Sequence, residues 1–332
     1  MQVKVAEEWL NICGGCEVTI LDMGEELVPL LPSLDFVHMP VLMDHKYHGQ
    51  TGEKDPHKIE IPDADVGIIT GGVSNEKEKA IALEMRKKCK LIISLGSCAC
   101  FGGIPAMVNN WTTEEMMEKV YRNTISTDST SADPHTDLPK LLDRVYAIDE
   151  VIKVDLSIPG CPTSPDLVKG ALSSLLSGKP FVMPEKSVCD ECPTIRTMKS
   201  SDIKLKRSLT EAKFETGKPY NEMRCLLEQG FMCLGPVTKA GCAGLTTEPG
   251  EKAIPRCIKG FMPCRGCFGP VKPESDPLID YTNAVATVGI DPATITDRKM
   301  LLYRYIGAHN KLSPKKAAKT GKPGLKKTES GS

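Results

Sequence analysis

The stretch QVKVAEEWLNICGGCEVTILDM, residues 2–23, decides the fold. Residues 2–9 indicate a β-strand, and the apolar spacing of residues 18–31 predicts a helix. A strand, a loop and a helix therefore follow one another in order. Many nucleotide-binding α/β proteins carry a glycine-rich phosphate loop at this point. This chain instead carries two thiols there, Cys13 and Cys16.

The alternation of strand and helix signals continues along the chain. Short apolar runs that end in Gly or Ser predict strands, and amphipathic spacing or a Ser-Pro start predicts helices. The expected strands are residues 36–42, 65–72, 89–97 and 151–159, and the expected helices are residues 75–89 and 164–178. Strands that alternate with helices predict a parallel sheet. We therefore expect an α/β, flavodoxin-like domain over residues 1–183.

The composition changes after Pro184. Residues 189–267 hold eight cysteines among many Gly, Pro and Lys residues, and the apolar periodicity fades. Something other than an apolar core must hold this part together, so we expect a largely irregular, metal-bearing domain over residues 184–311. Within it, residues 278–308 regain apolar content and are expected to wrap back over the first domain. Residues 312–332 are rich in Lys and are expected to form a disordered tail.

Composition and charge exclude several classes of protein. The net charge is −1 and the charged fraction is 26%, so nothing points to nucleic acid or to an anionic membrane. We also expect no membrane span and no export signal, because no apolar run is long enough and the first residues lack a charged start. These features predict a cytoplasmic protein. A reducing cytosol keeps the fourteen cysteines as thiols, and many thiols in such a protein usually mean metal.

Four cysteines follow the carboxyl ends of expected strands. Cys13 and Cys16 follow the first strand, Cys98 follows the fourth and Cys161 follows the fifth. Because the carboxyl ends of parallel strands share one edge of the sheet, these thiols should converge. Four thiolates hold either a zinc ion or a [4Fe-4S] cube, and Pro162 after the last cysteine favours iron and sulfur. The alternative is four ordinary buried thiols.

The eight later cysteines make two further four-ligand sets with none left over. The sets are Cys189, Cys192, Cys225 and Cys233, and Cys242, Cys257, Cys264 and Cys267. Zinc ribbons are the alternative, and they would make the protein a zinc-stabilised scaffold rather than an electron carrier. Cys89 and Cys100 belong to no set and are expected to be structural thiols.

Six motifs together resemble the small, electron-transferring subunit of [NiFe] hydrogenases. They are WLNICGGCE (9–17), GSCACFGGIP (96–105), IPGCPTSP (158–165), CDECP (189–193), CLLEQGFMCLGP (225–236) and PCRGCFGP (263–270). The resemblance extends from residue 2 to about residue 270. Within the family it is strongest to the cytoplasmic, methyl-viologen-reducing type of methanogenic archaea, which does not reduce the deazaflavin coenzyme F420.

This resemblance implies three [4Fe-4S] clusters, whose ligands we call the proximal, medial and distal sets. The proximal set is Cys13, Cys16, Cys98 and Cys161; the medial set is Cys242, Cys257, Cys264 and Cys267; the distal set is Cys189, Cys192, Cys225 and Cys233. A large subunit would hold the nickel–iron centre, so catalysis on dihydrogen belongs to the complex. Electrons would leave through a [2Fe-2S] adaptor (delta) subunit to a heterodisulfide reductase complex.

The chain departs from the periplasmic enzymes of the family at two ligands. Cys189 stands where they have a His, and Cys257 stands where many have a Pro that leaves a three-iron medial cluster. Both departures point to low-potential [4Fe-4S] clusters, since a thiolate in place of an imidazole adds negative charge. Glu17, directly after Cys16, is a candidate proton relay, and a carboxylate that stabilises a helix N-terminus is the alternative. The nearest alternative families are the small subunit of the deazaflavin-reducing hydrogenase and a related complex I subunit, which lacks the eight-cysteine region.

Overall fold

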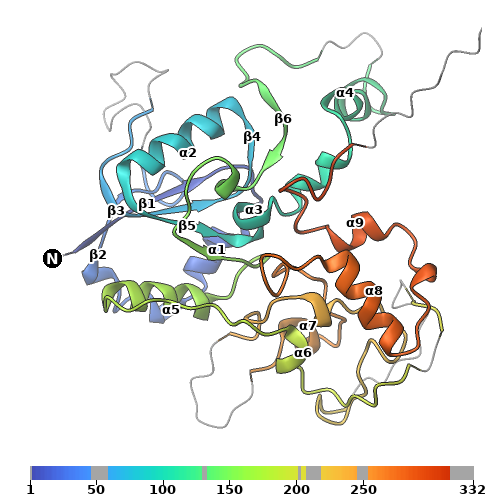
Figure 1. The fold of residues 1–332 in the computed structure, drawn as a ribbon. Coiled ribbons are helices and arrows are strands. Elements are labelled where there is room, and N and C mark those ends of the chain that lie inside the picture. The colour runs from blue at the N-terminus through green and yellow to red at the C-terminus, as the bar shows by residue number, and fades with distance from the viewer. Residues whose placement is uncertain are drawn as a thin grey trace, which may run out of the picture.

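The computed structural model describes residues 2–45, 59–128, 133–200, 203–206, 218–244 and 253–314. Regular structure is concentrated in the first part of the chain (Figure 1). The strands are β1 Val3–Trp9, β2 Leu34–His38, β3 Ala64–Thr70, β4 Val73–Asn75, β5 Cys89–Leu95, β6 Leu141–Tyr146 and β7 Leu156–Ile158. The α-helices are α1 Gly15–Leu21, α2 Glu76–Lys88, α3 Gly96–Phe101, α4 Thr113–Met117, α5 Pro165–Leu176, α6 Val188–Glu191, α7 Arg256–Lys259, α8 Pro277–Thr287 and α9 Arg298–Leu302.

Five strands form one parallel sheet in the order β2-β1-β3-β5-β7. Counted along the chain within this sheet, that order is 2-1-3-4-5, the flavodoxin-like order. The register pairs Ala6 with Gly67, and Ile68 with Ile93. The predicted α/β fold with a parallel sheet is therefore confirmed. The structure adds a short antiparallel pair, β4 and β6, that the sequence did not predict.

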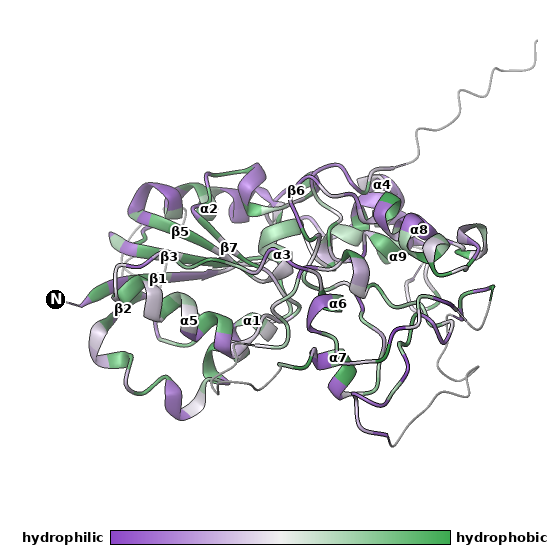
Figure 2. Cartoon of the chain, turned by 60° about the horizontal axis from the view of Figure 1, so that its bottom comes forward, coloured by the Kyte–Doolittle hydropathy of each residue, from purple (hydrophilic) through white to green (hydrophobic). Residues whose placement is uncertain are grey.

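Neighbouring residues of the central strands point to opposite faces of the sheet. Val5, Ile68 and Ile93 belong to the core on the side of α1 and α5, and Ala6, Ile69 and Ile92 belong to the core under α2. The helices thus cover both faces of the sheet (Figure 1), and apolar strands lie between helices with polar outer surfaces (Figure 2). Strands buried on both faces are typical of parallel sheets.

The helix predicted over residues 18–31 is wrong in extent. The helix α1 ends at Leu21, and two short 3-10 turns follow it, η1 (Gly24–Glu26) and η2 (Leu31–Ser33). Gly24, three residues beyond Leu21, has a left-handed φ of 55°, which a continuous right-handed helix does not contain. Farther along, Pro29 and Pro32 lack the backbone N–H that a helix would require. Met23 is buried in the core on this side of the sheet, and Leu27 packs against that core. Val18, Leu21 and Leu31 are instead 53%, 51% and 42% exposed.

The second part of the chain shares its core with the first. The core on the α5 side of the sheet continues through Leu167 and Phe268 to Tyr281 on α8. Farther along, the Ala308 N–H donates to the Phe101 carbonyl at 3.0 Å, and Gly103 forms an isolated parallel β-bridge with Ile306. The predicted return of residues 278–308 is therefore confirmed, whereas residues 315–332 of the predicted tail lie outside the described residues. Within the described part, none of the helices combines the length and hydrophobicity that crossing a bilayer requires.

Candidate metal centres

The proximal set comes together at the carboxyl edge of the sheet. Cys13 and Cys16 bracket the turn from β1 into α1, where Gly14 has a left-handed φ of 89°. Cys98 lies on α3 directly after β5, and Cys161 follows β7. The four thiols influence one another electrostatically, since Cys98 and Cys161 both raise the pKa of Cys16 and Cys13 raises that of Cys98. Strand ends thus bring these thiols together, as expected from the topology.

Gly96 is the residue that lets Cys16 approach the end of β5. A Cβ atom at this position would lie 2.3 Å from the Cys16 Sγ, and the φ of Gly96 is 87°. No L-residue with a side chain fits both constraints.

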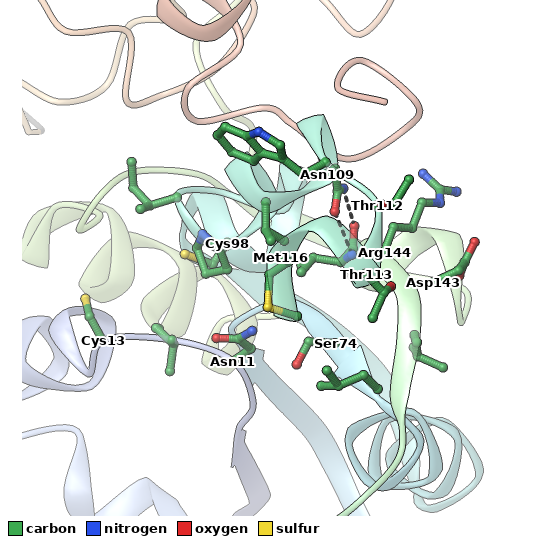
Figure 3. Close-up of a pocket in the computed structure, with 18 of the residues that line it drawn as sticks. Asn11, Cys13, Ser74, Cys98, Asn109, Thr112, Thr113, Met116, Asp143 and Arg144 are labelled. Atoms are coloured by element: carbon green, nitrogen blue, oxygen red, sulfur yellow. Dashed lines mark hydrogen bonds between the residues drawn. The ribbon is translucent and has the colours of Figure 1, made fainter. Parts of the chain in front are cut away.

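An apolar cavity of about 540 Å³ opens beside the proximal set. Cys13, Cys98 and Cys161 line it together with side chains from η3 (Pro105–Asn110), α4 and β6. In Figure 3 the two labelled cysteines lie at one end of this cavity, and Asp143 and Arg144 lie at the other. The thiols therefore face a hollow that is open to a second molecule.

The medial set surrounds a second cavity of about 170 Å³. Its lining includes the four medial cysteines and also Cys161 of the proximal set. The backbone N–H of Cys161 acts to lower the pKa of the Cys267 thiol, so the two sets are neighbours. Burial, followed by the charge of Cys257, raises the pKa of Cys267 to about 12.

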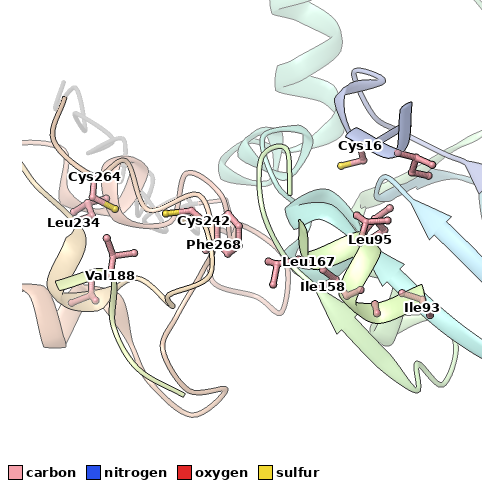
Figure 4. Packing of buried hydrophobic residues seen from close by; sticks show 14 of the residues in the cluster. Cys16, Ile93, Leu95, Ile158, Leu167, Val188, Leu234, Cys242, Cys264 and Phe268 are labelled. Atoms are coloured by element: carbon pink, nitrogen blue, oxygen red, sulfur yellow. The ribbon is translucent and has the colours of Figure 1, made fainter. Parts of the chain in front are cut away.

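The distal set lines a smaller cavity of about 20 Å³ together with Cys264 of the medial set. Cys189 is the second residue of the short helix α6, and Cys192 is its C-cap; Ser187 caps the other end in a capping box. The backbone N–H of Cys264 donates to the Cys233 Sγ at 3.3 Å. Distal and medial sets are therefore also in contact. In Figure 4 the medial Cys242 lies between the proximal Cys16 and the medial Cys264, so Cys264 is on the side of the medial set that is away from Cys16.

Burial makes these thiols poor acids without a cation beside them. It raises the pKa of Cys98 to about 12, of Cys242 to about 11 and of Cys233 to about 12. Backbone N–H groups counteract this in part, for example those of Ile104 at Cys98 and Arg256 at Cys242. Thiolates in such places need iron or another cation to neutralise them, and the N–H donors are the kind that tune cluster sulfur.

The four thiols of each set match the ligand number of a [4Fe-4S] cluster, whose four ligands bind four different irons. Within the described residues, no three Cys, His, Asp or Glu side chains come close enough to bind a single metal ion. The ligands of a cubane surround the inorganic core and do not have to meet at one atom. The donor chemistry of four thiols per set therefore fits a [4Fe-4S] cube.

Cys89 and Cys100 lie outside the three sets. Cys89 is buried in the core under α2. Cys100 is buried as well, and its thiol lies 3.4 Å from the hydroxyl and from the carbonyl of Ser94. Both therefore have the surroundings of structural thiols, as expected.

Glu17 belongs to a group of buried carboxyls beneath the proximal set, whose other members, Glu7 and Glu8, were not predicted from the sequence. Glu17 is buried and accepts a hydrogen bond from the Thr70 hydroxyl. Burial, followed by the charges of Glu17 and Glu8, raises the pKa of Glu7 to about 9. The Nε2 atom of His38 lies 2.6 Å from the Glu8 Oε1, and both side chains are fully buried. The sequence did contain a signal for this group. Glu7 and Glu8 are adjacent in β1, which has a neighbouring strand on each side, and neither side chain can face water.

Comparison with known proteins gives a consistent result. A family model described as NADH ubiquinone oxidoreductase, 20 Kd subunit, matches residues 13–175. An F420-non-reducing hydrogenase subunit from Methanothermobacter thermautotrophicus is 35% identical over 287 residues, covering 86% of this chain and 84% of the relative. An F420-non-reducing hydrogenase vhu subunit from Methanocaldococcus jannaschii is 35% identical over 306 residues, covering 92% and 95%.

A solved structure agrees with these relatives. The crystal structure of an NAD+-reducing [NiFe]-hydrogenase in the H2-reduced state contains a chain that matches with a TM-score of 0.50 and 26% identity. The match covers 55% of this chain and 96% of that chain. The family model ends before Cys189, whereas the two relatives extend over the cysteine-rich second part.

Proposed function

The chain belongs to the family of F420-non-reducing hydrogenase small subunits, part of the [NiFe] hydrogenases, and from this premise we propose that it conducts electrons out of the enzyme through three [4Fe-4S] clusters. The catalytic site of such an enzyme lies in the large subunit. There dihydrogen is split into two protons and two electrons, and each cluster, when bound, accepts and releases one electron at a time.

The observation that carries this proposal is the grouping of twelve thiols into three sets that touch in series. Cys161 contacts both the proximal and the medial cavity, and Cys264 contacts both the medial and the distal cavity. Each set supplies four thiolates, the usual ligands of a [4Fe-4S] cube. A series of nearby sites divides one long electron transfer into several short ones. We further propose that the chain divides into a flavodoxin-like domain over residues 1–183, a metal-bearing domain over residues 184–311 and a tail over residues 312–332.

The large subunit is proposed to dock over the proximal set. The apolar cavity there is lined by Cys13, Cys98 and Cys161 and is open on one side. Next to it, Ile104 is 43% exposed, although it follows directly on the buried helix α3. Exposed apolar side chains around an apolar hollow are typical of an interface. A partner seated there would exclude water from the proximal thiols.

Electrons are proposed to leave at the distal set, to a [2Fe-2S] adaptor subunit and then to a heterodisulfide reductase complex in the cytoplasm. Ile195 and Met198 lie just after the distal pair of cysteines and are 48% and 60% exposed. Between them, Arg196 donates to the Cys189 carbonyl at 2.9 Å. This surface offers a docking protein apolar contacts close to a ligand of the distal set.

Glu17 is proposed to be part of a proton relay on the nickel side of the chain. Its carboxylate is buried beside Cys16 and is bound by the Thr70 hydroxyl, so it is directed at a neighbouring strand. A carboxylate whose only role is to stabilise the first turn of α1 would be expected to face solvent. The buried position therefore favours the relay over the helix-dipole role.

The test is anaerobic purification from the native host with metal analysis and identification of the bound chains. We expect a brown complex, bleached by dithionite, with about twelve irons in this chain. We expect a large subunit, an adaptor and a heterodisulfide reductase to co-purify. A colourless chain that contains zinc would instead establish the scaffold alternative, and about four irons would contradict a three-cluster path.

A further inference from the structure

Tyr281 is a buried tyrosine whose hydroxyl has no hydrogen-bond partner. It lies on α8, which packs against the 3-10 turn η7, Gly235–Val237, and its exposed fraction is 0%. Among the described residues, no group hydrogen-bonds its Oη atom. The backbone N–H of Cys233 approaches the hydroxyl without reaching hydrogen-bond geometry. Buried hydroxyls are normally satisfied, so this one requires an explanation.

The surroundings of the hydroxyl are thiols from two sets. Its electrostatic neighbours are Cys233, Cys264 and Cys189. The same three cysteines surround Gly235, where a Cβ atom would lie 3.0 Å from the Cys189 Sγ and 3.7 Å from the Cys233 Sγ. Tyr281 therefore lies at the junction of the distal and medial sets. Two of its three neighbours, including the one with the largest effect, belong to the distal set.

We infer that the Tyr281 hydroxyl donates a hydrogen bond to a sulfur of the distal cluster, on its Cys233 side, and raises the reduction potential of that cluster. This inference rests on the proposed function, because it requires a cluster in the distal set. Reduction adds negative charge to the cluster, so a hydrogen-bond donor stabilises the reduced state more than the oxidised one. A raised distal potential would favour the transfer of electrons toward the exit.

The substitution Tyr281→Phe tests this directly. Phenylalanine fills the same space, and no other group loses a partner, so the iron content is expected to stay at the wild-type level. Redox titration of the whole, anaerobically purified complex, followed by low-temperature EPR, should give a lower midpoint potential for the distal signal. That signal is identified as the one lost in Cys192→Ser. The proximal signal should keep its midpoint potential, since Tyr281 has no proximal thiol among its neighbours.

Tyr303→Phe is the matched control. The Tyr303 hydroxyl donates to the Asp276 Oδ1 at 2.7 Å, and Asp276 caps α8 by accepting from the Leu278 N–H at 2.9 Å. This variant loosens the same helix without removing a group beside the thiols, so the distal potential should not move. An equal shift in both variants would overturn the inference, because helix packing would then be the cause.

An unchanged distal potential in Tyr281→Phe, at wild-type iron content, would overturn this inference and leave the proposed function intact. A wild-type chain with far fewer than about twelve irons would instead contradict the proposed function itself. The two failures are therefore distinguishable in one set of preparations.

Discussion

The Ser97 hydroxyl donates a hydrogen bond to the backbone carbonyl of Cys267. The same hydroxyl accepts from the Gly160 N–H at 3.0 Å, and the Ser97 N–H donates to the Gly160 carbonyl at 2.8 Å. One buried serine thus joins the segments that carry Cys98, Cys161 and the last medial cysteine. The relative position of the proximal and medial sets depends on this side chain.

Ser97→Ala should therefore destabilise the junction of the two sets. The variant leaves the Cys267 carbonyl and the Gly160 N–H without this partner, and we expect a loss of about 1–3 kcal/mol in the free energy of unfolding. Anaerobic denaturant titration measures it, and iron release during the titration should begin earlier. The control is Ser177→Ala, because the Ser177 hydroxyl bonds the Ser174 carbonyl at an exposed helix end. An equal loss in both variants would contradict the role assigned to Ser97.

Gly96→Ala should abolish the proximal cluster. The added methyl group would lie 2.3 Å from the Cys16 Sγ, and alanine is strained at a φ of 87°. We expect about eight irons instead of about twelve, with the medial and distal EPR signals retained. Gly178→Ala separates the clash with Cys16 from the backbone strain. Gly178 also has a left-handed φ, 66°, but no atom lies within 4 Å of an added Cβ there. Full iron content in Gly96→Ala would show that Cys16 moves freely or is not a ligand.

The parallel sheet was predictable from the sequence because each strand carries its signal locally. Residues 65–72 and 89–97 are apolar on both faces, and each run ends in Gly or Ser. The convergence of Cys13 and Cys98 followed from this topology, since both lie just past strand ends. The helix over residues 18–31 was predicted too long, because its apolar spacing outweighed the breaking residues within it, Gly24 and Pro29.

The contacts between the sets could not be predicted, because no local pattern encodes them. Ser97 and Cys267 are 170 positions apart, and they meet only after the second part of the chain folds back on the sheet. The buried hydroxyl of Tyr281 is similar, since its helix reads as an ordinary amphipathic segment. Packing decides such contacts, and the apolar periodicity that predicts a strand or helix does not specify them.

Cys257→Pro should convert the medial cluster to [3Fe-4S] and raise its potential. Cys257 is the second residue of α7, where proline is tolerated because the first N–H groups of a helix have no partner within it. Loss of one thiolate frees one corner iron, so we expect about eleven irons and a new EPR signal in the oxidised state.

Cys89→Ala is the control for this substitution. It removes a buried thiol that belongs to no set, so the iron content and every EPR signal should remain as in the wild type. An unchanged EPR spectrum in Cys257→Pro would mean that the fourth medial ligand is a different residue.

Glu7→Gln should change how stability depends on pH. Burial, followed by the neighbouring charges of Glu17 and Glu8, raises the pKa of Glu7 from 4.5 to about 9. Between these values the folded chain holds a proton that the unfolded chain has released. The free energy of unfolding should therefore be highest below about pH 4.5 and fall as the pH rises to about 9, by at most about 1.4 kcal/mol per pH unit from this group.

Glutamine has the shape of the protonated carboxyl and cannot ionise, so the variant should lose this decline. Its advantage over the wild type should be smaller at pH 6 than at pH 8.5, and thermal unfolding of the complex at both values would give the difference. Glu222→Gln is the control, because Glu222 is exposed and its substitution should leave the pH profile unchanged. Parallel profiles for Glu7→Gln and the wild type would mean that Glu7 is ionised in the folded chain. The buried carboxyls beneath the proximal set would then carry one more negative charge than they do with Glu7 protonated.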